Sequence, residues 1–116
     1  MQTHRIKVDM YAGGSSRQII MLSQRDTNAR IIMELFASRG LFNIEQGTTA
    51  KVVGKNAAGS PVQTNAILDV ANATAMIDVP KAMTDEQGQG VYEVLLTKSG
   101  KELRSRNITV IVERAA

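Results

Sequence analysis

The sequence predicts an all-β fold, an antiparallel β-sandwich of about seven to nine strands. Apolar and polar residues alternate with a period of two along most of the chain, as in strands with one buried face. Turn residues interrupt this alternation about every ten residues, and helical periodicity is almost absent. The 116 residues, 43% of them hydrophobic, suffice for a single domain with its own core, which we place at residues 1–116.

The first third of the chain predicts three strands. Residues 6–10 alternate between apolar and polar side chains, and the sequence GGSS at 13–16 then breaks the strand. A second strand is expected at 17–22. The third runs from residue 30, with Ile31, Met33 and Leu35 on one face and Arg30, Ile32 and Glu34 on the other, until the Arg-Gly pair at 39–40 ends it.

A polar corner (residues 24–30, QRDTNAR) separates the second and third predicted strands. Arg25 and Arg30 bracket it with fixed positive charge. Its short polar side chains can bond the local backbone and cap a turn, and they are Asp26, Thr27 and Asn28. We expect a structural corner here, because the segment offers no base, nucleophile or metal cage.

The middle of the chain predicts a hairpin and a further strand. Residues 50–55 alternate, 56–60 supply a turn with a glycine in the left-handed region, and 62–70 return. The next strand covers 74–79, with Ala75, Ile77 and Val79 facing inward, and the following proline ends the pairing by removing a donor. A short helical turn is expected at 81–83.

The final third predicts the hairpin at the centre of the core. Tyr92, Val94 and Leu96 form one face of a strand, and residues 98–101 make the turn. An unbroken return strand would bury the two arginines at 104 and 106, so we expect a loop or bulge there. The last regular strand should start near Asn107, and its inward residues are Ile108, Val110 and Val112.

Tyr92 occupies the position of a tyrosine corner. In immunoglobulin-like folds, a tyrosine early in the penultimate strand returns its hydroxyl to the backbone a few residues upstream. The residue two positions later is Val94, and the chain has no Trp and no Cys, so a disulfide-type immunoglobulin domain is excluded. Tyr92 fits this role, and we expect its hydroxyl to pin the corner.

The charge pattern argues against nucleic acid as a partner. The chain carries +3 with a sequence pI near 9.5, but residues 1–97 are neutral and the excess falls at the last hairpin. A nucleic-acid surface interleaves basic and aromatic residues, and the chain has two Tyr and two Phe. We interpret the basic excess as a solvated hairpin tip that discourages edge pairing.

The sequence gives no sign of a membrane segment or an export signal. The N-terminal residues lack the apolar stretch of a signal peptide, and no apolar run approaches the roughly 18 residues of a membrane span. We therefore expect a soluble protein without a cleaved signal.

The residues that could carry catalysis are scattered. His4 is the single histidine and is expected to be a solvated terminal residue. No serine lies in an elbow motif, and the adjacent acids Asp85 and Glu86 lack the dense ligand loop of a calcium site. The sequence GQG at 88–90 precedes a strand, whereas a phosphate loop opens a helix. We predict no enzyme, no cofactor and no metal.

Apolar residues also fall on strand faces that the alternation assigns to solvent. Together with Leu41 and Phe42 in a loop, they indicate a covered surface. The cover is either loops of the same chain or a partner. These outward residues are Ile32, Val53, Met76, Leu95 and Ile111.

The chain resembles the N-terminal domain of phage baseplate upper proteins. The polar corner is the most specific matching segment, and the late strand Ser105-Arg106-Asn107-Ile108-Thr109-Val110 is the second. Further matching segments are Ile6-Lys7-Val8-Asp9, Phe42-Asn43-Ile44, Lys51-Val52-Val53-Gly54-Lys55, Gly59-Ser60, Tyr92 and Arg104-Ser105. The resemblance implies an immunoglobulin-like sandwich that docks on the baseplate core of the tail and carries receptor-binding parts.

We therefore predict a non-enzymatic structural protein of a phage or prophage particle, located in the virion and, during assembly, in the host cytoplasm. Its partners are other virion structural proteins and copies of itself. Two alternatives stay open: a capsid decoration or head-fibre base protein, and a carbohydrate-binding β-sandwich that would use Tyr11 or Phe42. The predicted docking residues are Arg25, Asp26, Arg30, Ile32, Val53 and Met76.

Overall fold

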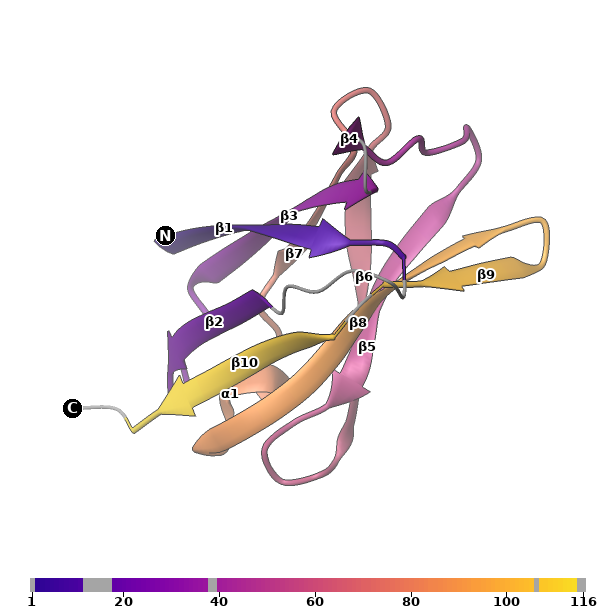
Figure 1. The fold of residues 1–116 in the computed structure, drawn as a ribbon. Coiled ribbons are helices and arrows are strands. Elements are labelled where there is room, and N and C mark those ends of the chain that lie inside the picture. The colour runs from indigo at the N-terminus through magenta and orange to yellow at the C-terminus, as the bar shows by residue number, and fades with distance from the viewer. Residues whose placement is uncertain (1, 12–17, 38–39, 106, 115–116) are drawn as a thin grey trace.

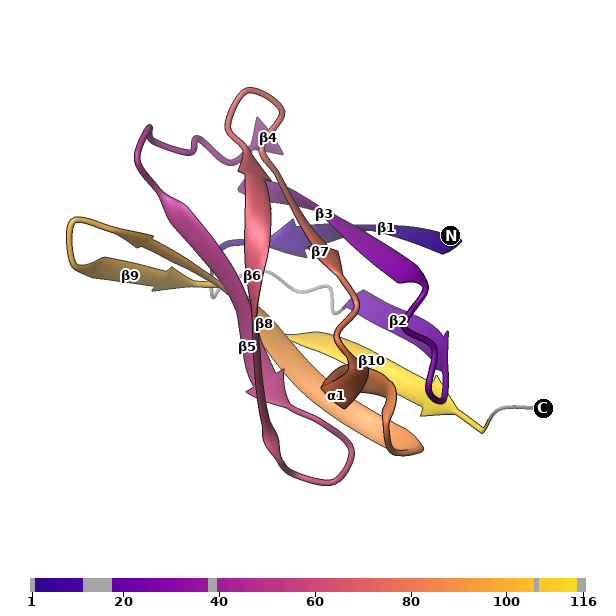
Figure 2. The ribbon, with the colours of Figure 1, turned by 180° about the vertical axis from the view of Figure 1, so that it is seen from behind.

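The described chain consists almost entirely of strands. The structure is a computed structural model, and it describes residues 2–11, 18–37, 40–105 and 107–114. Figures 1 and 2 show the fold from opposite sides. The described elements are β1 (Gln2–Asp9), β2 (Gln18–Ser23), β3 (Ala29–Ala37), β4 (Gly40–Leu41), β5 (Thr49–Lys55), β6 (Pro61–Asp69), β7 (Thr74–Asp78), α1 (Lys81–Thr84), β8 (Gly88–Lys98), β9 (Lys101–Arg104) and β10 (Ile108–Glu113).

The strands form two packed layers that share one strand. Sheet A has the order β1-β3-β7-β6, with β4 beside β3, and sheet B has the order β6-β5-β8-β10-β2, with β9 beside β8. β6 contributes residues 61–66 to sheet B and residues 67–69 to sheet A. The predicted all-β sandwich is therefore confirmed, with β6 passing from one layer to the other.

Two strand pairs correct the prediction of a purely antiparallel sandwich. β1 runs parallel to β3, and β2 runs parallel to β10. Both β1 and β2 lie at the ends of the strand order, and the chain passes from sheet A to sheet B between them. Because these two neighbours in sequence belong to different sheets, neither forms a hairpin with the other. Alternation defines the face of a strand and carries no information on its direction.

The described residues contain ten strands, which exceeds the predicted seven to nine. One addition is β4, which has two residues. The other comes from the predicted break in the last hairpin, which divides the return strand into β9 and β10. At this break the Ser105 hydroxyl accepts a hydrogen bond of 2.8 Å from the Val94 amide. Arg106 lies outside the described residues.

The turns follow the predicted chemistry. Between β5 and β6, the Asn56 side chain accepts hydrogen bonds from the amides of Ala58 and Ser60, and Gly59 has a φ of 82°. Between β8 and β9, Ser99 and Gly100 both have positive φ values, 51° and 78°. Two consecutive positive φ values match the twist of a two-residue hairpin. The β8–β9 hairpin extends away from the two layers in Figures 1 and 2.

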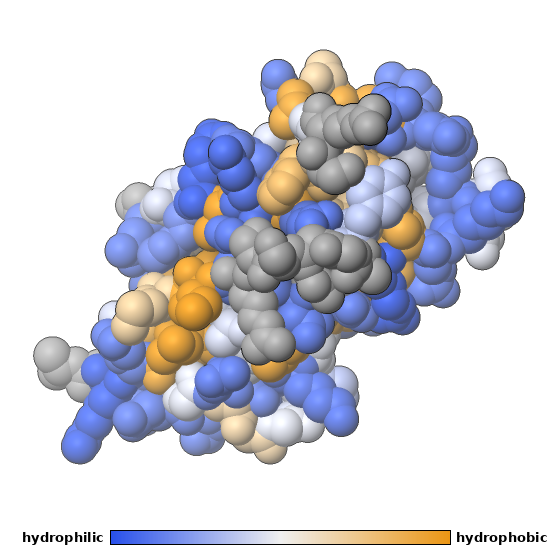
Figure 3. Space-filling model, viewed as in Figure 1, coloured by the Kyte–Doolittle hydropathy of each residue, from blue (hydrophilic) through white to orange (hydrophobic). Residues whose placement is uncertain are grey.

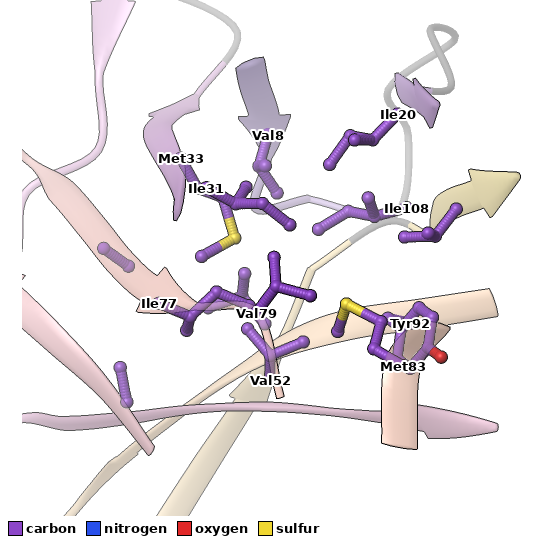
Figure 4. Close-up of a cluster of buried hydrophobic side chains, with 14 of the residues drawn as sticks. Val8, Ile20, Ile31, Met33, Val52, Ile77, Val79, Met83, Tyr92 and Ile108 are labelled. Carbon is purple, nitrogen blue, oxygen red and sulfur yellow. The ribbon is translucent and has the colours of Figure 1, made fainter. Parts of the chain in front are cut away.

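The core lies between the inward faces of the two sheets (Figure 4). β3 buries its alternate residues as predicted, and α1 adds Met83, which lies beside Tyr92. Burying such side chains is the main favourable contribution to folding, at about 1.5–3 kcal/mol each. The largest fully buried side chains are Tyr92, Met10, Met33, Leu35, Met83, Val8, Val94, Val110 and Thr84.

Tyr92 is buried but does not form the predicted tyrosine corner. Its side chain is 1% exposed, and its hydroxyl has no hydrogen-bond partner among the described residues. Burial raises the pKa of this hydroxyl to about 12. The prediction that Tyr92 lies on the core face of its strand is confirmed. The hydroxyl does not bond the upstream backbone, so Tyr92 acts by packing.

Within the described residues, no helix has the length and apolar character that crossing a bilayer requires.

Candidate functional site

The polar corner is held against α1. The Asp26 carboxylate accepts a hydrogen bond of 2.9 Å from the Asn28 amide. The Thr84 hydroxyl donates to the Asp26 carbonyl at 3.0 Å, and the Arg25 amide donates to the Thr84 carbonyl at 2.8 Å. Arg25 adopts a φ of 65°, a conformation that costs a non-glycine residue energy and that these bonds maintain.

The side chains of the corner differ in exposure. Arg25, Thr27 and Asn28 are exposed, whereas Asp26 is half-buried. Gln24 also connects the corner to its surroundings, because its side-chain amide donates to the Asp85 carbonyl at 3.1 Å. The backbone of the corner therefore has a structural role. The exposed side chain of Arg25 is available for contact with a partner.

The outer face of sheet A carries an apolar row between two charged rows. In the apolar row Ile32 lies opposite Met76, and Met76 lies opposite Ile67. On the β1 side of β3, Arg5 lies opposite Ile32, so the row ends at β1. Side chains directly opposite each other on one face of a sheet are in contact range, so the three apolar residues form a continuous strip.

Ion pairs and hydrogen bonds organise the charged rows. On one side of the strip, the Arg30 guanidinium contacts the Asp78 carboxylate at 3.0 Å. On the other side, Arg5 contacts Glu34 at 3.0 Å. Hydrogen bonds from Asn72 lower the pKa of Asp69, which lies at the edge of the same face.

A surface groove of about 590 Å³ follows this strip. Ile67 and Leu41 are 67% and 65% exposed, which is unusual for large apolar residues that lie together. The groove contains the apolar strip, charged residues from the row of Glu34, and Leu41. We call it the sheet A groove; its lining is Arg5, Ile32, Glu34, Leu41, Ile67, Asp69, Asn72, Thr74 and Met76.

The structure brings together only part of the predicted docking set. Ile32 and Met76 line the sheet A groove, and Arg30 lies on the same face in the adjacent row. Val53 lies on the outer face of sheet B, opposite Glu93. Arg25 and Asp26 belong to the corner beside α1.

Sequence reasoning missed Ile67, which completes the strip. The residue lies in a stretch of β6 with the sequence NAILD, where three apolar residues in succession obscure which one faces outward. The pairing of Ile67 with Met76 assigns it to the outer face of sheet A. Leu41 was noted as an apolar loop residue, and its place beside Phe36 in the β3–β4 pair comes from the fold.

A second apolar surface covers the β2 end of sheet B. Ile111 lies opposite Met21, and Thr109 lies opposite both Ile19 and Val91. Ile19 and Met21 are more than half exposed. Figure 3 shows an orange patch over β2 and β10. Only Ile111 was predicted to face outward, although Ile19 and Met21 follow from the same parity rule once Ile20 and Leu22 are placed inside.

A cleft of about 420 Å³ lies between the 42–48 segment and the β8–β9 hairpin. Lys98 forms an ion pair with Glu45 at 2.8 Å, which lowers the pKa of Glu45. Phe42 lines the cleft and packs edge-on against Tyr11, with ring centroids 6.0 Å apart. We call this space the hairpin cleft.

The residues considered for catalysis do not assemble into a site in the described chain. His4 is half-buried and points toward the interior, opposite Ile31, and its Nε2 atom is buried with no hydrogen-bond partner in the described part of the chain. The expectation that His4 is a solvated terminal residue is therefore wrong. Residues 88–90 begin strand β8. Among the described residues, no three His, Asp or Glu side chains are grouped so that they could hold a metal ion.

The comparisons with known proteins identify a fold and no sequence family. No protein-family model matches the chain, and no curated protein matches it. Among solved structures, the chain is similar to the N-terminal domain of phage TP901-1 ORF48. The TM-score is 0.78 at 15% sequence identity, and the match covers 97% of this chain and 99% of that chain. At this identity the match establishes that the two share a fold along nearly their whole lengths.

Proposed function

We propose that the chain is a non-enzymatic structural protein of a phage or prophage particle. The observation that supports this proposal most strongly is the similarity of fold, over 97% of the chain, to a domain of a phage protein. The resemblance of the polar corner and the late strand to baseplate upper proteins supports the same function from the sequence. Because a fold can serve several functions, the particle itself must supply the test.

The proposed mechanism is docking through the sheet A groove. An apolar strip between charged rows can bury its centre against a partner while its rims determine orientation. The face of one small domain offers a limited contact area, so a single contact would be weak. Repeated copies in a particle raise the effective concentration of each contact, and weak docking then becomes stable.

The position in the particle is proposed to be the tail baseplate. A capsid decoration or head-fibre base protein is the alternative, since both positions require a rigid docked domain without catalysis. Mass spectrometry of separated tails and heads from purified particles tests this assignment. Recovery of the chain in tail fractions at constant stoichiometry supports the baseplate position, and recovery in heads supports the alternative. Absence from purified particles would reject the structural function.

Arg25 and Arg30 provide a test of which surface docks. We expect Arg30→Ala combined with Ile32→Asp to reduce incorporation, because both residues lie on the outer face of sheet A. Arg25→Ala, at the corner, serves as the comparison variant. If Arg25→Ala alone abolishes incorporation of a folded chain, the docking edge lies at the corner and the sheet A groove is the wrong surface.

A further inference from the structure

Beyond docking, we propose that the hairpin cleft binds a neutral saccharide. The cleft combines an apolar floor with a polar rim, and its volume of about 420 Å³ falls in the usual range of small-ligand pockets. The apolar floor contains Phe42, Ile44, Leu96 and Leu103. The carbon faces of a sugar ring pack against such a floor while its hydroxyl groups remain available to the rim.

The charges of the rim determine the class of ligand. Lys98 and Lys101 supply donors, and Glu45 and Glu102 supply acceptors. An anionic ligand would meet the two carboxylates, and a cationic ligand would meet the two ammonium groups. A sugar hydroxyl both donates and accepts, so a neutral polyhydroxylated ligand can bond both kinds of group without a repulsive contact.

The geometry of the cleft supports a site that exists before a ligand arrives. The ion pair between Lys98 and Glu45 joins the β8–β9 hairpin to the 42–48 segment. The Thr48 hydroxyl donates to the Glu45 carbonyl at 2.8 Å and so closes the turn that carries Glu45. Tyr11 is half exposed and packs against Phe42, so an aromatic pair lies at the edge of the cleft.

NMR titration of the ¹⁵N-labelled full chain tests this proposal. The probes are glucose, galactose, rhamnose, N-acetylglucosamine, maltose and lactose, each added separately. We expect at least one of them to shift amide signals within residues 42–48 and 96–103, with a Kd of about 1 mM or weaker, as is usual for a small open site. No shift with any probe, or shifts confined to other surfaces, would overturn the proposal.

Variants and charged probes test which rim residues bind and whether the ligand is neutral. Lys101→Ala and Glu102→Ala change exposed rim residues and should each weaken binding about fivefold, because each removes one hydrogen-bonding group. Lys81→Ala, an exposed change in α1, is the matched control and should leave the affinity unchanged. Tighter binding of inorganic phosphate or of free lysine at the same residues would contradict the assignment to a neutral ligand. Incorporation into particles is a separate measurement, so failure here leaves the docking proposal unaffected.

Discussion

Gly54 of β5 lies directly opposite Tyr92 of β8, and the tyrosine fills the space that a side chain at Gly54 would need. A Cβ atom at residue 54 would lie 2.7 Å from the Tyr92 Cα and would overlap the Val91 carbonyl oxygen. The backbone atoms on the neighbouring strand cannot move aside as a flexible side chain could. A glycine and a large aromatic residue therefore act as one packing unit across the two strands.

Replacing Gly54 by alanine should destabilise the fold by about 2 to 3 kcal/mol, because the new methyl group overlaps the backbone of β8. Chemical denaturation measures the free energy of unfolding. Gly47→Ala is the comparison variant, since a Cβ atom there meets nothing within 4 Å and only its φ of 86° opposes the change. A loss at Gly54 no greater than that at Gly47 would show that the two strands are not packed as described.

The buried Tyr92 hydroxyl should make stability fall in alkaline solution. Its pKa is raised to about 12 in the folded chain, whereas an unfolded tyrosine ionises near 10.0. Between these values the unfolded state loses its proton first, so the free energy of unfolding decreases as pH rises. At about pH 11 the decrease due to this group should be about 1 kcal/mol. Denaturation at about pH 9 and about pH 11 measures it.

Tyr92→Phe provides the control for this pH effect. The variant should lose the part of the alkaline decrease that Tyr92 causes, while the contributions of lysines remain. At neutral pH it should be as stable as the original chain or more stable, because the hydroxyl is buried without a partner. A marked destabilisation at neutral pH would indicate that the hydroxyl is in fact hydrogen-bonded.

The hydroxyl of Thr84 should contribute to the stability of the polar corner. Thr84→Val keeps the shape of this fully buried side chain but leaves the Asp26 carbonyl without the donor that it now has. We expect a loss of about 1 to 2 kcal/mol in thermal or chemical denaturation. Thr109→Val on the outer face of β10 is the matched control and should change stability by less than about 0.5 kcal/mol. Equal effects of the two changes would contradict the anchoring of the corner to α1.

The carboxylate of Asp69, at the edge of the sheet A groove, should respond to the loss of its neighbour Asn72. Hydrogen bonds from Asn72 lower the pKa of Asp69, so Asn72→Ala should move this pKa upward toward its ordinary value. Titration of the carboxyl carbon signal by NMR follows the change. Asn65→Ala, on the same strand as Asp69, should leave the titration of Asp69 unaltered.

The sequence alone was sufficient to predict the strands and the inward faces, because burial of one face produces a period of two. Ile31, Met33 and Leu35 in β3 are buried as predicted, and so are Ala75 and Ile77 in β7. The break before Ile108 was also predictable, since an unbroken strand would have buried two arginines.

The order and direction of the strands could not be predicted in this way. Which strand pairs with β1 depends on contacts between segments far apart in the chain, and the parallel pairs of β1 and β2 leave no local signal. For the same reason the outward residues Ile32 and Val53 looked equivalent in the sequence. The fold places Ile32 on sheet A and Val53 on sheet B.

The sheet A groove became recognisable only when the strands were paired. Ile32 and Met76 were predicted to face outward, but their contact with Ile67 requires the register of β3, β7 and β6. Their separation in the sequence, from residue 32 to residue 76, means that no local motif contains them both.

Docking through the sheet A groove is tested most directly by quantifying an Ile67→Asp variant in purified particles by mass spectrometry. Ile67 is 67% exposed, so the isolated variant should remain folded, which its thermal unfolding checks. Gln63→Asp, at an exposed position of the same strand, introduces the same charge on the sheet B portion of β6 and is the matched control. We predict that Ile67→Asp is depleted from particles about tenfold or more, as a loss of about 1.4 kcal/mol in docking would cause, while Gln63→Asp is incorporated normally. Normal incorporation of folded Ile67→Asp would contradict docking through this groove.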